Sequence, residues 1–113
     1  MEFDKTLLAG STGMMVLKLL EQEDMYGYQM IEALRERSDH TFDLKAGTLY
    51  PLLHTLEQKG YIEAQVTEQQ SGRARRYYHL TRAGRGQLAE KEAQWRVYAR
   101  SVARVLDGGV CYG

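Results

Sequence analysis

The arginines in the middle of the chain are the clearest group of side chains with a chemical role. Between Gln69 and Ala89 the sequence has five arginines and no acidic residue. They are Arg73, Arg75, Arg76, Arg82 and Arg85. The planar guanidinium group binds phosphate oxygens through paired hydrogen bonds. The run from Arg73 to Arg76 therefore predicts contact with a nucleic-acid backbone. The alternative is that these arginines belong to an ordinary solvated turn.

The formal net charge of the 113-residue chain is zero, but its charges are unevenly distributed. The segment Glu21–Asp43 has seven acids and two bases, whereas Gln69–Ala89 has only positive charges. A chain of this polarity can present a cationic face while it stays neutral overall. A net charge of zero therefore does not exclude nucleic-acid binding.

A second candidate group lies in the segment 46–61, AGTLYPLLHTLEQKGY. At helical spacing its leucines share one face, which predicts burial. The opposite face carries Tyr50, Pro51, His54, Thr55 and Gln58, without a Lys or Glu among them. Hydrogen-bonding and flat side chains are what a helix needs to read base edges in the major groove. The alternative is a core helix with an ordinary polar back.

Catalysis and metal binding are not expected. His40, His54 and His79 are scattered, and no Gly-rich phosphate loop is present. His54 and Glu57 have the i, i+3 spacing of a ligand pair, but no third ligand is close in the sequence. The single cysteine, Cys111, cannot form an intramolecular disulfide. We therefore predict a protein without a cofactor or catalytic residues.

Three helices are predicted to position the reading face. Ser11 or Thr12 can cap the first, and the second runs from about Tyr26 to Ser38. Gly27, within the start of the second helix, suggests close packing against another backbone. In the third helix Pro51 is expected in the first turn, where its missing N–H costs little, and Gly60 ends the helix.

A β-hairpin and a long helix follow. YIEAQVTEQQ and ARRYYHL, joined through residues 70–73, have the composition of two short strands. Thr81 is a good N-cap for a helix that extends to Asp107, about 40 Å at 1.5 Å per residue. Its apolar stripe has to be buried somewhere, and we predict a dimer interface there. The predicted interface residues are Leu88, Trp95, Tyr98, Val102, Val105 and Leu106.

This order of elements is that of a winged helix-turn-helix, in which the third helix enters the major groove and the hairpin contacts the flanking backbone. The predicted fold class is α+β, mostly helical, with three helices, a β-hairpin wing and a long C-terminal dimerisation helix. The expected boundaries are 1–80 for the DNA-binding domain, 81–107 for the dimerisation helix and 108–113 for a flexible tail. Without an apolar run of membrane-spanning length or a signal-peptide pattern, a cytoplasmic location is expected.

The chain resembles the PadR-like transcriptional regulators in their short form with one C-terminal helix. The resemblance covers about residues 7–106 and is carried by YGYQMIEAL, GTLYPLLHTLEQKGYI and GRARRYYHLTRAG, in this order and spacing. It implies a homodimeric DNA-binding protein, usually a repressor, that leaves its DNA when a small molecule binds or conditions change. Thr55 stands where a basic residue is common, and Ala74 replaces a frequent proline. The positions that match the DNA-facing surface of the family are Tyr26, Thr48, Tyr50, Pro51, His54, Arg73, Arg75 and Arg76.

The resemblance also indicates partners. A symmetric dimer would bind double-stranded DNA at a palindromic operator, and two copies of Trp95 could line a pocket for a flat aromatic or apolar effector. Plain interface packing is the alternative role for Trp95. The alternative function for the whole chain is a protein-interaction adaptor, because a winged-helix scaffold can also bind proteins.

Overall fold

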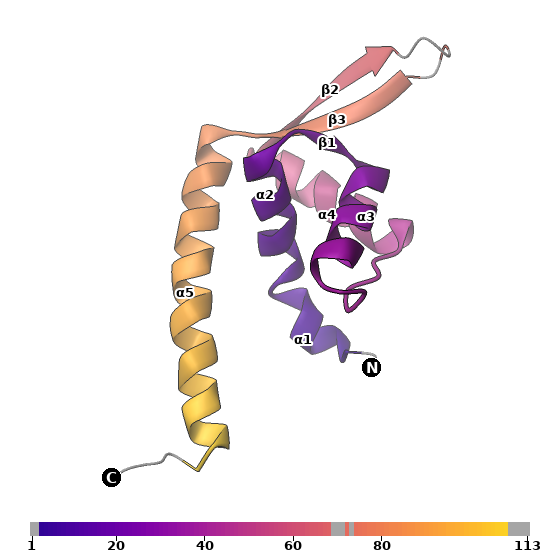
Figure 1. Cartoon of the computed structure of the whole chain (residues 1–113). Coiled ribbons are helices and arrows are strands. Elements are labelled where there is room, and N and C mark those ends of the chain that lie inside the picture. The colour runs from indigo at the N-terminus through magenta and orange to yellow at the C-terminus, as the bar shows by residue number, and fades with distance from the viewer. Residues whose placement is uncertain (1–2, 69–71, 73, 109–113) are drawn as a thin grey trace.

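The computed structural model describes residues 3–68, 72 and 74–108, and shows an elongated protein of 64 × 31 × 21 Å. Five helices and three strands make up the described part (Figure 1). In chain order they are α1 Lys5–Ala9, α2 Thr12–Gln22, β1 Met25–Tyr26, α3 Gly27–Arg37, α4 Ala46–Gln58, β2 Ile62–Glu68, β3 Ala74–Leu80 and α5 Arg82–Leu106. Arg73, Cys111 and most of the predicted tail lie outside the described residues.

The predicted hairpin forms the larger part of a three-stranded antiparallel sheet in the order β1-β3-β2. Ile62 pairs with Leu80 at the closed end, and Glu68 pairs with Ala74 toward the tip. The two-residue strand β1 was not predicted, and it pairs Tyr26 with Tyr77. The sheet therefore ties the start of α3 to the wing.

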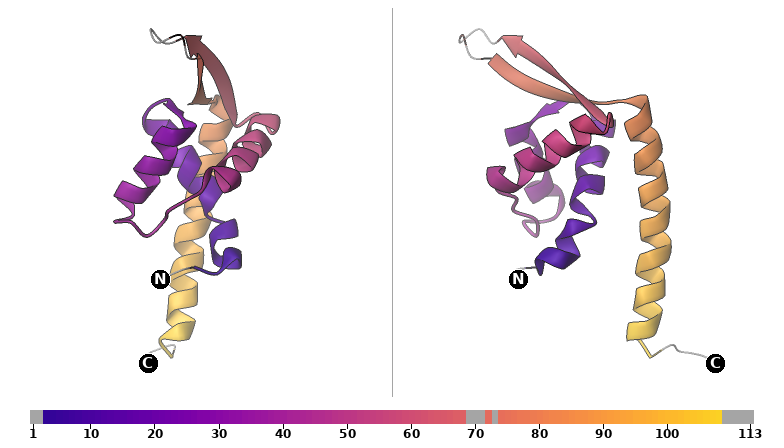
Figure 2. Two further views of the ribbon diagram at one scale, coloured as in Figure 1. Left: turned by 90° about the vertical axis from the view of Figure 1, so that its right-hand side faces the viewer. Right: turned by 180° about the vertical axis from the view of Figure 1, so that it is seen from behind.

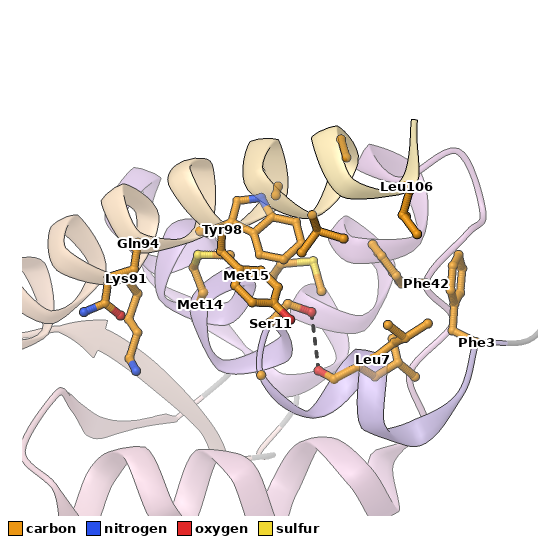
Figure 3. Close-up of a pocket in the computed structure, with 16 residues that line it drawn as sticks. Phe3, Leu7, Ser11, Met14, Met15, Phe42, Lys91, Gln94, Tyr98 and Leu106 are labelled. Atoms are coloured by element: carbon orange, nitrogen blue, oxygen red, sulfur yellow. Dashed lines mark hydrogen bonds between the residues drawn. The ribbon is translucent and has the colours of Figure 1, made fainter. Parts of the chain in front are cut away.

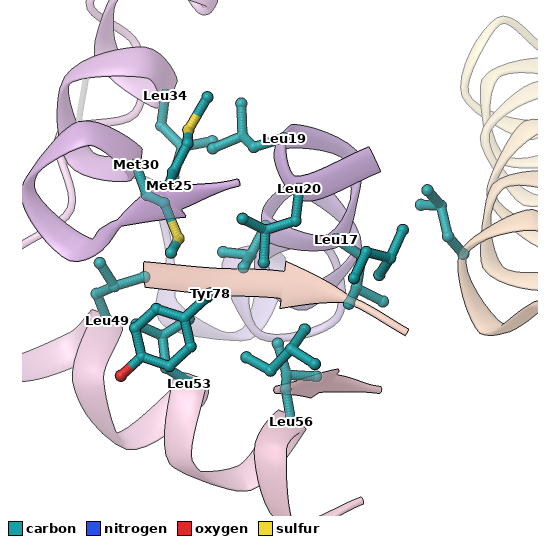
Figure 4. Packing of buried hydrophobic residues seen from close by; sticks show 14 residues of the cluster. Leu17, Leu19, Leu20, Met25, Met30, Leu34, Leu49, Leu53, Leu56 and Tyr78 are labelled. Atoms are coloured by element: carbon teal, nitrogen blue, oxygen red, sulfur yellow. The ribbon is translucent and has the colours of Figure 1, made fainter. Parts of the chain in front are cut away.

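One apolar core fills the space between α2, α3, α4 and the sheet (Figure 4). The buried face of α4 is the predicted leucine stripe, since Leu49, Leu53 and Leu56 are all buried and Leu52 is half-buried. Tyr78 of β3 lies among these leucines, with only 4% of its surface exposed. The core thus fixes the position of α4 against the sheet, and the opposite face of α4 stays open to solvent.

The ends of α4 differ in part from the prediction. The helix begins at Ala46 and its N-cap residue, Lys45, makes no side-chain capping bond. Pro51 therefore lies in the second turn, contrary to the expected first turn, and α4 lacks the bond that an N–H at this position would donate to Gly47. The predicted stop at Gly60 is confirmed, because this residue has φ +80° and lies just beyond the helix.

The start of α2 likewise shows no side-chain cap. Ser11 occupies the N-cap position without a side-chain capping bond, and Thr12 is the first helical residue. The Thr12 hydroxyl instead donates to the Leu8 carbonyl at 2.8 Å. This bond connects α2 to the short helix α1, which the sequence did not define.

The helix α5 leaves the domain on the side away from the hairpin tip and runs past α1 (Figures 1 and 2). Its N-cap is Thr81, as predicted, whose hydroxyl accepts from the Gly84 N–H at 3.0 Å. Lys18 of α2 donates to Glu92 at 3.2 Å and so ties the middle of α5 to α2. Hydrogen bonds to Glu21 and Glu92 raise the pKa of Lys18.

Leu88 departs from the predicted dimer interface. Its side chain has 0% exposure and belongs to the apolar core of the chain itself. Leu88, Trp95 and Val102 share one stripe of the helix because they recur every seven residues. The first turns of α5, however, pack on α2, and only the later turns project beyond the domain. Leu88 therefore has no exposed surface that a second chain could contact.

Candidate nucleic-acid interface

The outer face of α4 presents all of its predicted DNA-facing side chains to solvent. These are Thr48, Tyr50, Pro51, His54 and Thr55. The Thr55 hydroxyl donates to the Pro51 carbonyl at 3.1 Å, so it is turned back onto its own helix. His54 and Tyr50 are the exposed groups best suited to hydrogen bonds with bases or phosphates.

Tyr50 is held in place by the helix before it. A Cβ atom added at Gly27 would overlap the hydroxyl and the Cζ atom of Tyr50. The predicted close approach at Gly27 is thus real, but the neighbour is the Tyr50 side chain rather than a backbone. Because Gly27 is the first residue of α3, this contact sets how α3 and α4 lie against each other.

A second cluster joins the wing to the start of α3. The Arg75 guanidinium lies 4.3 Å from the centroid of the Tyr26 ring. Tyr26 in turn meets Tyr77 edge to face, with ring centroids 5.3 Å apart. The cation–π contact holds the arginine in place while leaving its N–H donors available. Tyr26 and Arg75, both predicted to face DNA, are therefore brought together.

Arg76 points to the opposite face of β3 and has a different partner. Its Nη2 atom donates to both carboxylate oxygens of Glu57 in α4, at 2.9 Å and 3.2 Å. The hydrogen bond with Glu57 raises the pKa of Arg76. The guanidinium also lies 5.8 Å from the centroid of the Tyr78 ring. Glu57 was not among the predicted site residues, and through this pair it links α4 to strand β3 of the wing.

Two further residues were missed. Tyr28 in the first turn of α3 is 58% exposed, and a single exposed tyrosine gives no pattern in the sequence. Asp24 Oδ1 accepts a 2.8 Å hydrogen bond from His79 Nδ1 across β1 and β3. The unpredicted strand β1 brings these two residues together. The pairing of Asp24 with His79 could not be found from the sequence, because it depends on the pairing of β1 with β3.

The described part of the chain contains no group of three His, Cys, Asp or Glu side chains that could hold a metal ion. Glu57, the possible partner of His54, pairs with Arg76 instead. Within the same residues, no helix is both long and apolar enough to cross a membrane.

An apolar groove lies apart from the reading face, between α1, α2 and the second half of α5 (Figure 3). Its cavity volume is about 850 Å³. Met14 and Met15 line it from α2, and Trp95, Tyr98 and Val102 line it from α5. Trp95 and Tyr98 remain 47% and 65% exposed. Most of the predicted interface residues line the groove. Val105, which is 77% exposed, does not line it.

Comparison with known proteins gives one consistent result. The family described as "Transcriptional regulator PadR-like family" matches residues 16–90. A transcriptional regulator of Mycobacterium tuberculosis is 44% identical over 70 residues, which cover 60% of this chain and 63% of that protein.

Solved structures agree with these sequence matches. A PadR family transcriptional regulator from Eggerthella lenta is 37% identical, with a TM-score of 0.78 over 89% of this chain and 86% of that one. A PadR-like regulator from Bacillus cereus is 31% identical, with a TM-score of 0.77 over 89% of this chain and 96% of that one.

Proposed function

The chain belongs to the PadR-like family of transcriptional regulators, and from this membership we propose that it binds a specific DNA operator as a homodimer and represses transcription. Members of this family are regulators and not enzymes. A regulator of this kind would act on DNA in the cytoplasm. The observation that carries the proposal is the pairing of an open, uncharged reading face on α4 with an arginine-bearing wing directly above it.

The helix α4 and the wing would have separate tasks. The hydroxyl and imidazole groups of Tyr50 and His54 would contact base edges or nearby phosphates in the major groove, with Thr48, Pro51 and Thr55 beside them. Arg75, held above Tyr26, would contact the flanking phosphates. The proposed wing contact of Arg73 falls outside the described residues.

The homodimer is supported by exposed apolar side chains on the later turns of α5. Trp95, Tyr98, Val102, Val105 and Leu106 are between 38% and 78% exposed. An apolar surface of this kind on a projecting helix is typical of an interaction site. A two-fold axis near α5 would present two reading helices to half-sites of a palindromic operator about 34 Å apart.

The groove near Trp95 is the proposed effector site. An aromatic or apolar molecule bound there would contact both α2 and α5, so it would change the angle between the domain and the dimer helix. A change in that angle alters the separation of the two reading helices and weakens operator binding. Titration of aromatic ligands tests this, because Trp95 is the single tryptophan and its fluorescence reports on the groove.

The experiment that tests the function is fluorescence anisotropy with DNA from upstream of the protein's own gene and with scrambled DNA, at two salt concentrations. A specific regulator binds the upstream DNA more tightly, with an affinity that falls steeply as salt rises. Salt-sensitive binding without preference would contradict the assignment of the target or of the reading helix. Absence of binding to either DNA would favour the protein-interaction adaptor.

A further inference from the structure

The wing arginines differ in their surroundings, although they are neighbours in the sequence. Arg75 lies on the neutral ring of Tyr26 and has no carboxylate partner among the described residues. Arg76 is held by the carboxylate of Glu57 on one side and by the Tyr78 ring on another. The Arg75 guanidinium therefore faces no opposite charge among the described residues, whereas the Arg76 guanidinium faces a carboxylate.

Glu57 is well placed to control this difference. It is the single acidic residue of α4, which has no basic residue, and its side chain lies in the last turn beneath β3. Both oxygens of this carboxylate accept from Nη2 of Arg76, so a DNA phosphate that binds the remaining N–H groups would lie beside the negative charge of Glu57 and be repelled by it. Both groups bind guanidinium through charged oxygens, so replacing one by the other gains little.

We propose that Glu57 is a specificity-determining residue, which withholds Arg76 from DNA phosphates and so limits binding that does not depend on sequence. Phosphate contacts strengthen binding to every DNA, whereas base contacts distinguish the operator. With fewer phosphate contacts, a larger share of the affinity for the operator comes from the proposed base contacts of α4. The inference rests on the proposed DNA-binding function.

Glu57→Gln tests it, because the amide keeps the size of the side chain and removes its charge. Freed Arg76 should gain one phosphate contact. The plot of log K against log salt should then steepen by about 0.9. Affinity for scrambled DNA should rise by about three- to tenfold at low salt, and the ratio of operator to scrambled affinity should fall. A slope equal to that of the wild type would overturn the proposal.

Three control variants separate this effect from simpler ones. Glu68→Gln removes the same charge from exposed β2, where Glu68 has no arginine partner among the residues that the structure describes, so its slope should stay that of the wild type. Arg76→Gln should also leave the wild-type slope nearly unchanged, and a decrease of about 0.9 would contradict the proposal even if Glu57→Gln failed to fold. In the double variant, Glu57→Gln should have no effect beyond that of Arg76→Gln.

DNA binding by the wild-type protein is measured before that of the variants. If it shows no salt-sensitive binding to any DNA, the proposed function fails and this inference fails with it. If the wild type binds DNA and the Glu57→Gln and Glu68→Gln variants behave alike, only the role of Glu57 is wrong.

Discussion

The hydroxyl of Tyr50 lies against the α-carbon of Gly27, so the side chain that faces the proposed DNA groove occupies space that only a glycine leaves free. The first residue of α3 and the second turn of α4 are thereby in direct contact. The orientation of the proposed reading face therefore depends on a glycine in the preceding helix.

Replacement of Gly27 by alanine should displace Tyr50 and weaken both the fold and operator binding. Overpacking of this kind costs about 1–3 kcal/mol in the free energy of unfolding, which urea denaturation measures. The double variant with Tyr50→Ala provides the control, since the added methyl group then has room. An equal destabilisation by Gly27→Ala in both backgrounds would show that Tyr50 is not the cause.

Arg75→Ala should weaken binding to operator and scrambled DNA in the same proportion. The guanidinium above Tyr26 is proposed to contact a phosphate, so its loss should reduce the salt slope by about 0.9. Anisotropy titrations over a range of salt concentrations measure both quantities. Arg100→Ala, an exposed arginine on α5 without a proposed DNA contact, should change neither.

His54→Ala should act mainly on discrimination. Loss of a base contact reduces the preference for the operator by about 1–3 kcal/mol and leaves binding to scrambled DNA nearly unchanged. Competition titrations with both DNAs measure this preference. If the His54→Ala and Arg75→Ala variants had the same profile, the division between a reading helix and a phosphate-binding wing would be incorrect.

Two glycines in the first turns of α5 should respond in opposite directions to alanine. A Cβ at Gly84 would overlap the Tyr61 carbonyl oxygen, whereas Gly86 has nothing within 4 Å. Gly84→Ala should therefore destabilise the protein by several kcal/mol, and Gly86→Ala should stabilise it by about 1 kcal/mol through helix propensity. Thermal and urea unfolding of the two variants compare them directly. A stabilising Gly84→Ala would contradict the packing of α5 against the end of α4.

Val102→Asp should dissociate the proposed dimer, because a charge placed in an apolar interface is costly to bury. Val97→Asp is the matched control, since Val97 is exposed on the same helix and does not line the groove with Trp95. Sedimentation at equal concentrations should find single chains only for Val102→Asp. Identical association states for the two variants would place the interface elsewhere.

Local sequence patterns were sufficient for most elements of this fold. Helical spacing of the leucines defined the buried face of α4, and Thr81 and Gly60 marked helix ends because their side chain or backbone has a specific local role. The start of α4 was misplaced because Lys45 carries no capping side chain that would mark it. The strand β1 was missed because two residues are too few to show alternation.

Contacts between distant residues were beyond the sequence patterns. Heptad spacing groups Leu88 with Trp95, but it does not say which protomer covers each of them. In the same way, the run from Arg73 to Arg76 has no acid near it in the sequence and therefore predicts phosphate contact for each of its arginines. The acid that compensates Arg76 is 19 residues away, in another element. Such pairings depend on how helix and hairpin meet in space.

The base of the hairpin is closed by several bonds at once. Thr81 donates its N–H to the Tyr61 carbonyl at 3.1 Å and its hydroxyl to the Gly60 carbonyl at 2.6 Å, while Ile62 and Leu80 pair as the first rung. The end of α4 and the start of α5 are therefore joined directly, and the residues between them form an insertion with fixed ends. Changes in length or charge in the outer part of the hairpin, beyond the pairs of β3 with β1, leave these bonds at its base intact. The angle between α4 and α5 is therefore set at the base of the hairpin and not at its tip.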